Sequence, residues 1–345
     1  MTHSEPILSV ANLSVRFPIG GGFIRKSKRY VHAVNGVTFT IKKGETLGLV
    51  GESGSGKTTV GRAIVRVNDP YEGSISLDGK ELVGLSPSEM RPLRRRVQMV
   101  FQDPYSSLDP RQSVRQILTE PLKTHNLPLT TANGDRVEEL LRVVGLDPAF
   151  ASRYPHQFSG GQRQRVGIAR ALAVEPELIV CDEPISALDV SIQAQVVNLL
   201  ESLKEKMGIA YLFIAHDLAV VRHIADRVAV MYLGSIVELA ASDEIYENPK
   251  HPYTAALLSA VPVPDSKVER ERSRTILKGD IPNPTDMPSG CAFNTRCPLS
   301  EKLGAPEICG TQRPPLRPLS IEKPMHLVSC HFANDAQSPT SYEQE

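Results

Sequence analysis

The feature that most constrains this chain is a glycine-rich loop between an apolar strand and a helix. Thr46–Val50 is a short apolar run, and the loop follows it directly, with the spacing G-x-x-x-x-G-K-[ST]. Glycine tolerates positive φ, so the backbone can turn its N–H groups toward an anion, and the next helix adds its positive end. The sequence therefore predicts a phosphate-binding loop. Its residues are Gly51, Glu52, Ser53, Gly54, Ser55, Gly56, Lys57, Thr58 and Thr59.

Two side chains at the end of this loop have predicted roles. We expect Lys57 to reach the β- and γ-phosphates of a nucleotide and the Thr58 hydroxyl to coordinate Mg²⁺. A chance glycine-rich turn is the alternative. It is disfavoured because the preceding strand and the following helix are the context that the phosphate-binding mechanism requires.

Composition limits the classes of protein that remain. The 345 residues suffice for one large domain with an appendage, or for two modest domains. Lys+Arg and Asp+Glu balance at 39 each, which argues against a dedicated nucleic-acid binder. No run of about 18 uncharged apolar residues occurs, so we expect no transmembrane helix. Without an export signal, the five cysteines are expected in a reducing compartment.

Strand and helix patterns alternate along much of the chain. This alternation predicts an α/β fold with a mostly parallel sheet that is covered on both faces. A basic loop over 19–29 reads as a solvated hairpin connection, and residues 105–157 read as mostly helical with breaks at prolines, including Pro121. The expected strands are 7–17, 31–41, 46–50, 74–77, 178–181 and 210–215, and the expected helices are 162–173 and 192–207.

The pattern also predicts a domain organisation. We expect a domain that contains the phosphate-binding loop over residues 1–245, with a helical subdomain inserted at about 103–165. A loop-rich C-terminal extension should cover 246–333, where prolines and cysteines cluster. Residues 334–345 are expected to be disordered.

Two acidic residues end a buried apolar run at Leu178–Glu183. A parallel strand delivers such side chains at its carboxyl end, where ligands bind in open α/β sheets. Asp182 then suits a Mg²⁺ ligand through water, and Glu183 suits a general base for an attacking water. A solvated surface turn is the alternative, which the nearby phosphate loop disfavours.

A second anion-binding helix start lies far from the first. Ser159, Gly160, Gly161 and Gln162 open a predicted helix, and a serine with two glycines there can hold a phosphate. One ATP needs only one phosphate loop. The second helix start is therefore explained most simply by a dimer in which each end serves a different nucleotide.

Ser159–Gln162 resembles the signature motif of the ABC ATPase superfamily, in which this motif closes over ATP bound to the other subunit. The resemblance covers about residues 7–250 and implies an ABC-type P-loop NTPase with a RecA-like core, an antiparallel β subdomain and the helical subdomain. It implies that Gln102 senses Mg²⁺ and the membrane partner, that His216 contacts the γ-phosphate, and that Asp189 lies in the D-loop. Phe17, with Tyr30 as the alternative, is expected to stack on adenine.

A finer resemblance links residues 99–111, 192–196 and 248–254 to the ATPase subunits of bacterial dipeptide/oligopeptide importers, as the second of two paralogous ATPases. It implies a heterodimer on two membrane permease subunits, fed by an extracytoplasmic solute-binding protein, at the cytoplasmic side of the inner membrane. Nickel and glutathione importers share this subfamily, so the solute stays open. A DNA-repair or ribosome-associated ABC ATPase is the rival class, and a non-catalytic ATP-binding regulator is a third.

Four cysteines gather in the last fifth of the chain, at Cys291, Cys297, Cys309 and Cys330. The first pair is C-x₅-C, which is not the C-x₂-C of common zinc ribbons, but four thiolates suit Zn²⁺ or a [4Fe–4S] cluster. Unrelated buried thiols and adventitious disulfides are the other readings. Members of the resembling importer family can carry an iron–sulfur cluster here, so we predict a structural [4Fe–4S] cluster.

Overall fold

Buried apolar strands form the centre of the molecule, in a computed structural model that describes residues 5–19, 29–103, 107–132, 134–261 and 275–334. In this part of the chain the main sheet has the strand order β13-β14-β12-β11-β3-β10-β9-β6. Neighbours from β11 to β6 are parallel, and β12, β14 and β13 extend the sheet in antiparallel fashion. The strands are β3 (Thr46–Val50), β6 (Val97–Val100), β9 (Leu178–Asp182), β10 (Ala210–Ala215), β11 (Arg227–Tyr232), β12 (Ser235–Ala241), β13 (Arg317–Pro318) and β14 (Leu327–Val328).

Alternate side chains of the parallel strands pack into two different cores. Tyr211 and Phe213 of β10 join the core formed with the helices on one face. Leu212 and Ile214 of the same strand join the core under the second sheet. All six residues of β10 are buried, because a sheet covered on both faces has no polar side.

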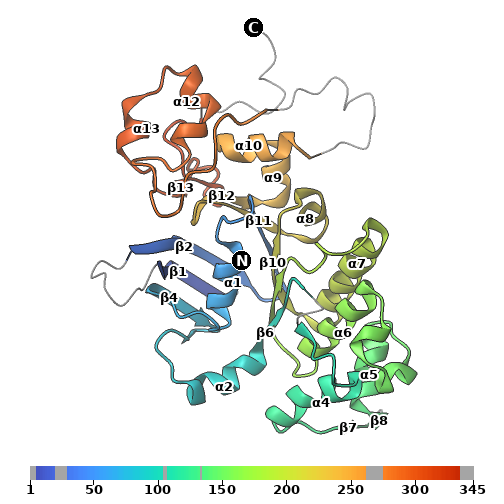
Figure 1. Ribbon diagram of the computed structural model, residues 1–345. Coiled ribbons are helices and arrows are strands. Elements are labelled where there is room, and N and C mark those ends of the chain that lie inside the picture. The colour runs from blue at the N-terminus through green and yellow to red at the C-terminus, as the bar shows by residue number, and fades with distance from the viewer. Residues whose placement is uncertain (1–4, 20–28, 104–106, 133, 262–274, 335–345) are drawn as a thin grey trace.

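The second sheet is antiparallel and shares a core with one face of the central sheet. Its order is β2-β1-β4-β5, and β1 pairs with both β2 and β4. Figure 1 shows it beside the central sheet, below the C-terminal extension. Its strands are β1 (Pro6–Ile19), β2 (Arg29–Lys42), β4 (Glu72–Leu77) and β5 (Lys80–Glu81), and a separate small pair is β7 (Thr130–Thr131) with β8 (Gly134–Asp135).

Side-chain caps start several of the helices. Ser86, Ser113 and Ser159 each form a reciprocal capping box with the residue three positions later, and Asp135 accepts two backbone N–H groups. The helices are α1 (Lys57–Ile64), α2 (Pro87–Arg96), α4 (Val114–Thr124), α5 (Arg136–Val143), α6 (Gly160–Leu172), α7 (Val190–Met207), α8 (Leu218–Ile224), α9 (Ser242–Glu247), α10 (Pro252–Ser259), α12 (Pro298–Lys302) and α13 (Glu307–Thr311), with 3₁₀ turns η1 (Pro148–Ser152), η2 (Pro155–Gln157) and η3 (Asn294–Arg296).

Within residues 105–157, the helix break that we expected at Pro121 does not occur. Pro121 lies inside α4 and does not end it. Leu118 and Leu122, on either side of it, are buried in the helical core, and the Pro121 carbonyl still accepts the His125 N–H. Tertiary packing therefore carries the helix past the residue that removes a backbone donor. No helix within the described ranges is long and apolar enough to cross a bilayer.

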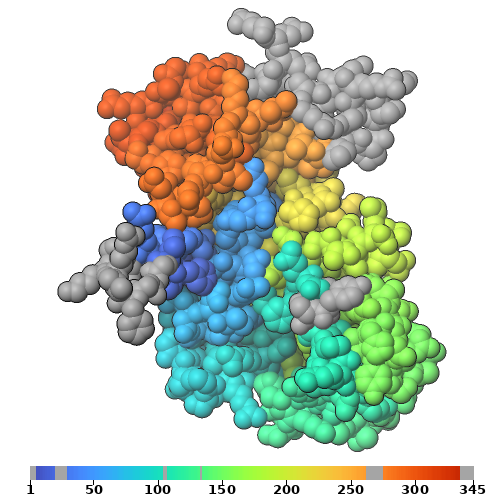
Figure 2. Space-filling model, in the orientation of Figure 1, coloured from blue at the N-terminus to red at the C-terminus, as the bar shows by residue number. Residues whose placement is uncertain are grey.

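The described residues of the C-terminal extension (246–261 and 275–333) include the orange surface that lies against the blue N-terminal part of the chain in Figure 2. Its strand β14 pairs with β12, placing Val328 opposite Glu238. His326 of the extension is buried and lies 2.7 Å from the buried Glu238 carboxylate. Short strands such as β13 and β14 give no periodic pattern, so the sequence reading missed them. The basic loop over 19–29 and the tail over 334–345 fall almost wholly outside the described residues.

His251 gives a prediction about stability and pH. Its imidazole is buried, and its Nδ1 accepts the Tyr253 N–H at the start of α10. Burial lowers the pKa of His251 to about 4 from 6.5, against the opposing effect of Glu238. Between these values the unfolded chain binds a proton that the folded chain does not. The free energy of unfolding should therefore fall by about 2 kcal/mol from this group as the pH drops from 7 to 5.

Thermal unfolding at both pH values tests this prediction against His251→Asn. Asparagine can still accept the Tyr253 N–H but does not titrate. Between pH 7 and pH 5, the free energy of unfolding should therefore fall less in the variant than in the unaltered protein. An equal pH dependence in both proteins would contradict the prediction.

Candidate functional site

The loop between β3 and α1 is shaped by two glycines that have no room for a side chain. Gly51 has φ 151°, and a Cβ there would lie 2.1 Å from the Met231 carbonyl oxygen. Gly56 has φ 102°, and a Cβ would lie 2.2 Å from the Ala33 carbonyl oxygen. The glycines therefore let the loop wrap closely over β11 and β2 and deliver Lys57 as the first residue of α1.

The ammonium group of Lys57 is buried and held by the loop itself. Its Nζ donates to the carbonyl oxygens of Gly51 at 2.8 Å and Glu52 at 2.9 Å, and to Ser55 Oγ at 3.4 Å. Burial lowers the pKa of Lys57, and the carboxylates of Glu183, Asp182 and Glu52 oppose that shift. The loop is thus folded around a cation that could bind an anionic ligand.

Thr58 and Asp182 meet across the first turn of α1 and the end of β9. The Thr58 hydroxyl donates to Asp182 Oδ1 at 2.7 Å, and Asp182 is almost fully buried. Burial raises the pKa of Asp182, and the hydrogen bond from Thr58 works in the opposite direction. A hydroxyl oxygen next to a carboxylate is an oxygen-donor set that fits Mg²⁺, an ion that takes one or two protein oxygens and completes its shell with phosphates and water.

Glu183 follows Asp182 in a strained backbone conformation. Its φ is 46°, a value that non-glycine residues adopt rarely and that is often found at functional sites. Its Oε2 accepts a hydrogen bond from Gln102 Nε2 at 2.8 Å and lies 3.5 Å from His216 Nδ1. Three predicted residues from separate parts of the chain therefore meet at one carboxylate.

A pocket of about 460 Å³ opens beside these groups. It combines the phosphate loop with the side chains that gather at Glu183, and it is the place where a ligand could contact all of them. Sequence reasoning missed Ala33, because an alanine in a strand carries no chemical signal. The lining residues are Ala33, Ser53, Gly54, Gly56, Lys57, Thr58, Thr59, Gln102, Glu183 and His216.

The two candidate adenine-stacking residues differ in what they contact. Phe17 is 39% exposed and pairs with Val31, which lies two residues, about 7 Å along β2, before the pocket residue Ala33. Tyr30 has its ring covered by the Arg16 guanidinium at 4.3 Å. The exposed ring of Phe17 is the better stacking surface of the two.

The residues of the second helix start do not line the Lys57 pocket. Ser159 and Gln162 are hydrogen-bonded to one another in the capping box of α6. A Cβ on Gly161 would lie 2.4 Å from Ile192, so this segment packs closely against α7, which begins after the exposed Asp189. None of Ser159, Gly160, Gly161, Gln162 and Asp189 is among the described residues that line the pocket.

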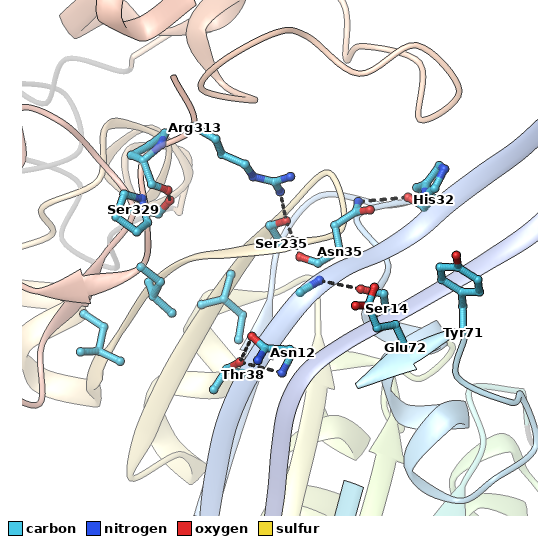
Figure 3. A pocket seen from close by; sticks show the side chains of 16 residues that line it. Asn12, Ser14, His32, Asn35, Thr38, Tyr71, Glu72, Ser235, Arg313 and Ser329 are labelled. Carbon is cyan, nitrogen blue, oxygen red and sulfur yellow. Dashed lines mark hydrogen bonds between the residues drawn. The ribbon is translucent and has the colours of Figure 1, made fainter. Parts of the chain in front are cut away.

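A larger cavity, of about 720 Å³, lies between the antiparallel sheet and the C-terminal extension (Figure 3). Arg313 reaches across it to the Ser235 hydroxyl, and Asn35 donates to the His32 carbonyl. Its charged side chains, Arg313 and Glu72, are exposed. The Lys57 pocket has the buried cation and the converging carboxylates, and we therefore place the functional site there.

The predicted [4Fe–4S] cluster, with Zn²⁺ as its alternative, is wrong. Across the described residues no three His, Cys, Asp or Glu side chains form a group that could hold a metal ion. Burial raises the pKa of Cys291, that of Cys297 to about 11 and that of Cys330 to about 12. Cys297 and Cys330 instead accept backbone N–H groups from Ser300 and Phe332.

The chain matches two protein-family models. Residues 34–186 match the model of the ABC transporter, and residues 237–302 match that of the oligopeptide/dipeptide transporter C-terminal region. The chain is 52% identical to the oligopeptide transport ATP-binding protein AppF of Bacillus subtilis (strain 168), over 96% of this chain and 98% of that protein. It is 50% identical to OppF of Escherichia coli (strain K12), an oligopeptide transport ATP-binding protein, over 94% and 95%.

A third relative and a solved structure extend these similarities. A putative peptide import ATP-binding protein of Brucella ovis is 49% identical over 94% of this chain and 97% of that protein. The structure is the dimeric ATP-binding cassette MJ0796 in a post-hydrolysis state with ADP and Pi. It aligns with a TM-score of 0.60 and 29% identity, over 68% of this chain and 98% of that one.

The bond between Thr58 and Asp182 gives a prediction for the ligand-free chain. Thr58→Val keeps the side-chain shape but leaves the buried Asp182 oxygen without its donor, which should lower the free energy of unfolding by about 1–3 kcal/mol. Thr58→Ser keeps the hydroxyl and is the matched control. Urea unfolding checks this, and equal midpoints for the valine and serine variants would contradict it.

Proposed function

Because this chain belongs to the ABC transporter family, with the C-terminal region of the oligopeptide/dipeptide transporters, we propose that it binds ATP in the Lys57 pocket to power oligopeptide import. The protein is an ATPase of the ABC type, and the predicted fold class is confirmed by its structural relatives. The observation that carries the proposal is that Lys57, at the start of α1, lies close to Asp182 and Glu183 at the end of β9.

The domain organisation that we propose follows the sequence expectation. Residues 1–245 form the ATPase domain, with the helical subdomain at about 103–165 and the C-terminal extension at 246–333. In support, α4, α5 and α6 pack into a core with the face of the main sheet opposite the antiparallel sheet. The extension adds β14 and β13 to the edge of the main sheet, next to β12.

The residues of the pocket have distinct proposed roles in binding ATP. The backbone of the Gly51–Thr59 loop and the Lys57 ammonium bind the phosphates, because burial leaves that cation poorly hydrated and ready to pair with an anion. Phe17 stacks on the adenine. Mg²⁺ bound by Thr58, Asp182 and Gln102 would neutralise charge on the phosphates.

Hydrolysis is proposed to use Glu183 as the general base. Its carboxylate orients a water and takes a proton from it as the water oxygen bonds to the γ-phosphorus. The bond from that phosphorus to the β–γ bridging oxygen breaks, giving ADP and inorganic phosphate. Gln102, at 2.8 Å, and His216, at 3.5 Å, hold the carboxylate in place, and His216 is also placed to contact the γ-phosphate.

The surface formed by Ser159–Gln162 and Asp189 is proposed to complete the ATP site of a partner chain. It lies apart from the Lys57 pocket and has a helix start with glycines, which suits a phosphate from another subunit. The structural relative described above is a dimer. We propose that the partner is a second, paralogous ATPase, which makes a heterodimer.

As an ABC transporter ATP-binding protein, the chain works with membrane permease subunits in a transport complex. We propose that it lies peripherally at the cytoplasmic side of the inner membrane, bound to two permeases that receive peptides from an extracytoplasmic solute-binding protein. The relatives, all oligopeptide or peptide transport proteins, favour peptides over nickel or glutathione. They give no support to a DNA-repair or ribosomal role.

The role of Glu183 is tested by Glu183→Gln. Glutamine keeps the shape and the hydrogen bond to Gln102 but cannot take a proton, so ATP turnover should fall by about 10²-fold or more while ATP still binds. Steady-state hydrolysis by the purified transporter complex and equilibrium binding of Mg²⁺-ATP to the chain measure the two effects. Lys57→Ala is the comparison, because it should weaken binding itself. Unchanged turnover in Glu183→Gln would exclude Glu183 as the base.

A further inference from the structure

Glu52, the second residue of the phosphate loop, is held from three directions. Its carbonyl oxygen accepts from Lys57 Nζ at 2.9 Å. Its backbone N–H donates to the Tyr253 hydroxyl at 2.9 Å. Its carboxylate receives both terminal nitrogens of Arg296, at 2.9 and 3.2 Å. Two of these three contacts come from the C-terminal extension.

Arg296 is placed for this contact by a buried aromatic cluster. Tyr232 at the end of β11, Tyr253 of α10 and Phe293 of the extension are each at most 1% exposed, and their ring centroids lie 4.6 to 5.4 Å apart. The Arg296 side chain is 7% exposed and also donates to the Tyr232 hydroxyl at 3.4 Å. This part of the extension therefore packs directly under the phosphate loop and presents one guanidinium to it.

Without a positively charged partner, the Glu52 carboxylate would repel an anion in a loop that binds phosphates. It lies close enough to Lys57 for its charge to oppose the lowering of the Lys57 pKa by burial, so it also acts on the region where an anion would bind. A bidentate pair with arginine neutralises the carboxylate and fixes its direction, and such paired contacts are stronger than neutral hydrogen bonds. The partly buried setting limits screening by salt.

We propose that Arg296 and Tyr253 are positioning residues through which the C-terminal extension sets the shape and charge of the phosphate loop, and so its affinity for nucleoside di- and triphosphates. The inference rests on the proposed function of the Lys57 pocket. Coupling between two sites is reciprocal, so nucleotide binding also tightens the contact between the extension and the loop.

A double-mutant cycle on Glu52 and Arg296 tests this proposal. Arg296→Met keeps the apolar stem against Tyr232 but leaves the Glu52 carboxylate unpaired, and affinity for ADP and a non-hydrolysable ATP analogue should fall about tenfold. Glu52→Gln should change affinity less than about threefold. The double variant should match Glu52→Gln, because the charge that harms binding is gone. Isothermal titration calorimetry on the full chain with Mg²⁺ measures all four affinities.

Two further variants separate positioning from simple support of the extension. Tyr253→Phe removes only the hydroxyl that accepts the Glu52 N–H, and nucleotide affinity should fall about threefold or more with the aromatic cluster kept. Lys278→Met breaks the exposed ion pair between Lys278 and Glu301 within the extension and is the matched control, with affinity unchanged. Arg296→Lys keeps the charge and should recover part of the loss.

The outcomes separate failure of this inference from failure of the proposed function. If the unaltered chain binds neither nucleotide, the proposed function fails. If it binds them, Lys57→Ala loses them and Arg296→Met binds as well as the unaltered chain, only the present inference is overturned. A loss from Arg296→Met that persists in the Glu52→Gln background would also overturn it, because it would then reflect general support of the fold.

Discussion

A single buried cation organises the candidate site. Lys57 is 4% exposed, so its charge must be satisfied within the protein, and the Gly51 and Glu52 carbonyl oxygens do this at 2.8 and 2.9 Å. The two glycines at the ends of the loop allow the backbone to close around it. A loop held in this way is already shaped before any ligand arrives, which lowers the ordering cost of binding phosphates. The surrounding strands and helices then hold that loop in position.

The parallel order of the central strands brings the remaining chemistry to this cation. β3, β9 and β10 are neighbours that run in one direction, so the phosphate loop, the acidic pair and His216 all follow carboxyl ends at one edge of the sheet. Asp182 then meets Thr58, and Glu183 meets His216 and Gln102. The positive φ of Glu183 is the local cost of turning its carboxylate toward the pocket rather than along the strand.

Local patterns predicted the parts of this arrangement that depend on short stretches of chain. The loop, the strand ending in Asp182 and the strand ending before His216 each have a recognisable sequence, and parallel pairing of such strands implies that they meet. Contacts that depend on tertiary packing could not be read in this way. Pro121 stays inside α4 because neighbouring leucines are buried, and β13 and β14 are too short for a periodic pattern. The cysteine cluster misled because proximity in sequence does not place side chains around one point, and among the described residues no three His, Cys, Asp or Glu side chains form a group that could hold a metal ion.

The pairing of Glu52 with Arg296 belongs to the same class of unpredictable contacts, because 244 positions separate the two residues. Neither residue has an evident role when it is considered alone. Glu52 occupies an x position of the G-x-x-x-x-G-K-[ST] motif, where any residue is allowed, and Arg296 directly precedes Cys297. Together they form a bidentate ion pair on a buried aromatic support, at the one loop whose shape sets phosphate binding. The significance of this partly buried pair lies in the phosphate loop that it contacts. It gives an appended segment a direct physical means of acting on the ATPase site, without any contact to the nucleotide itself.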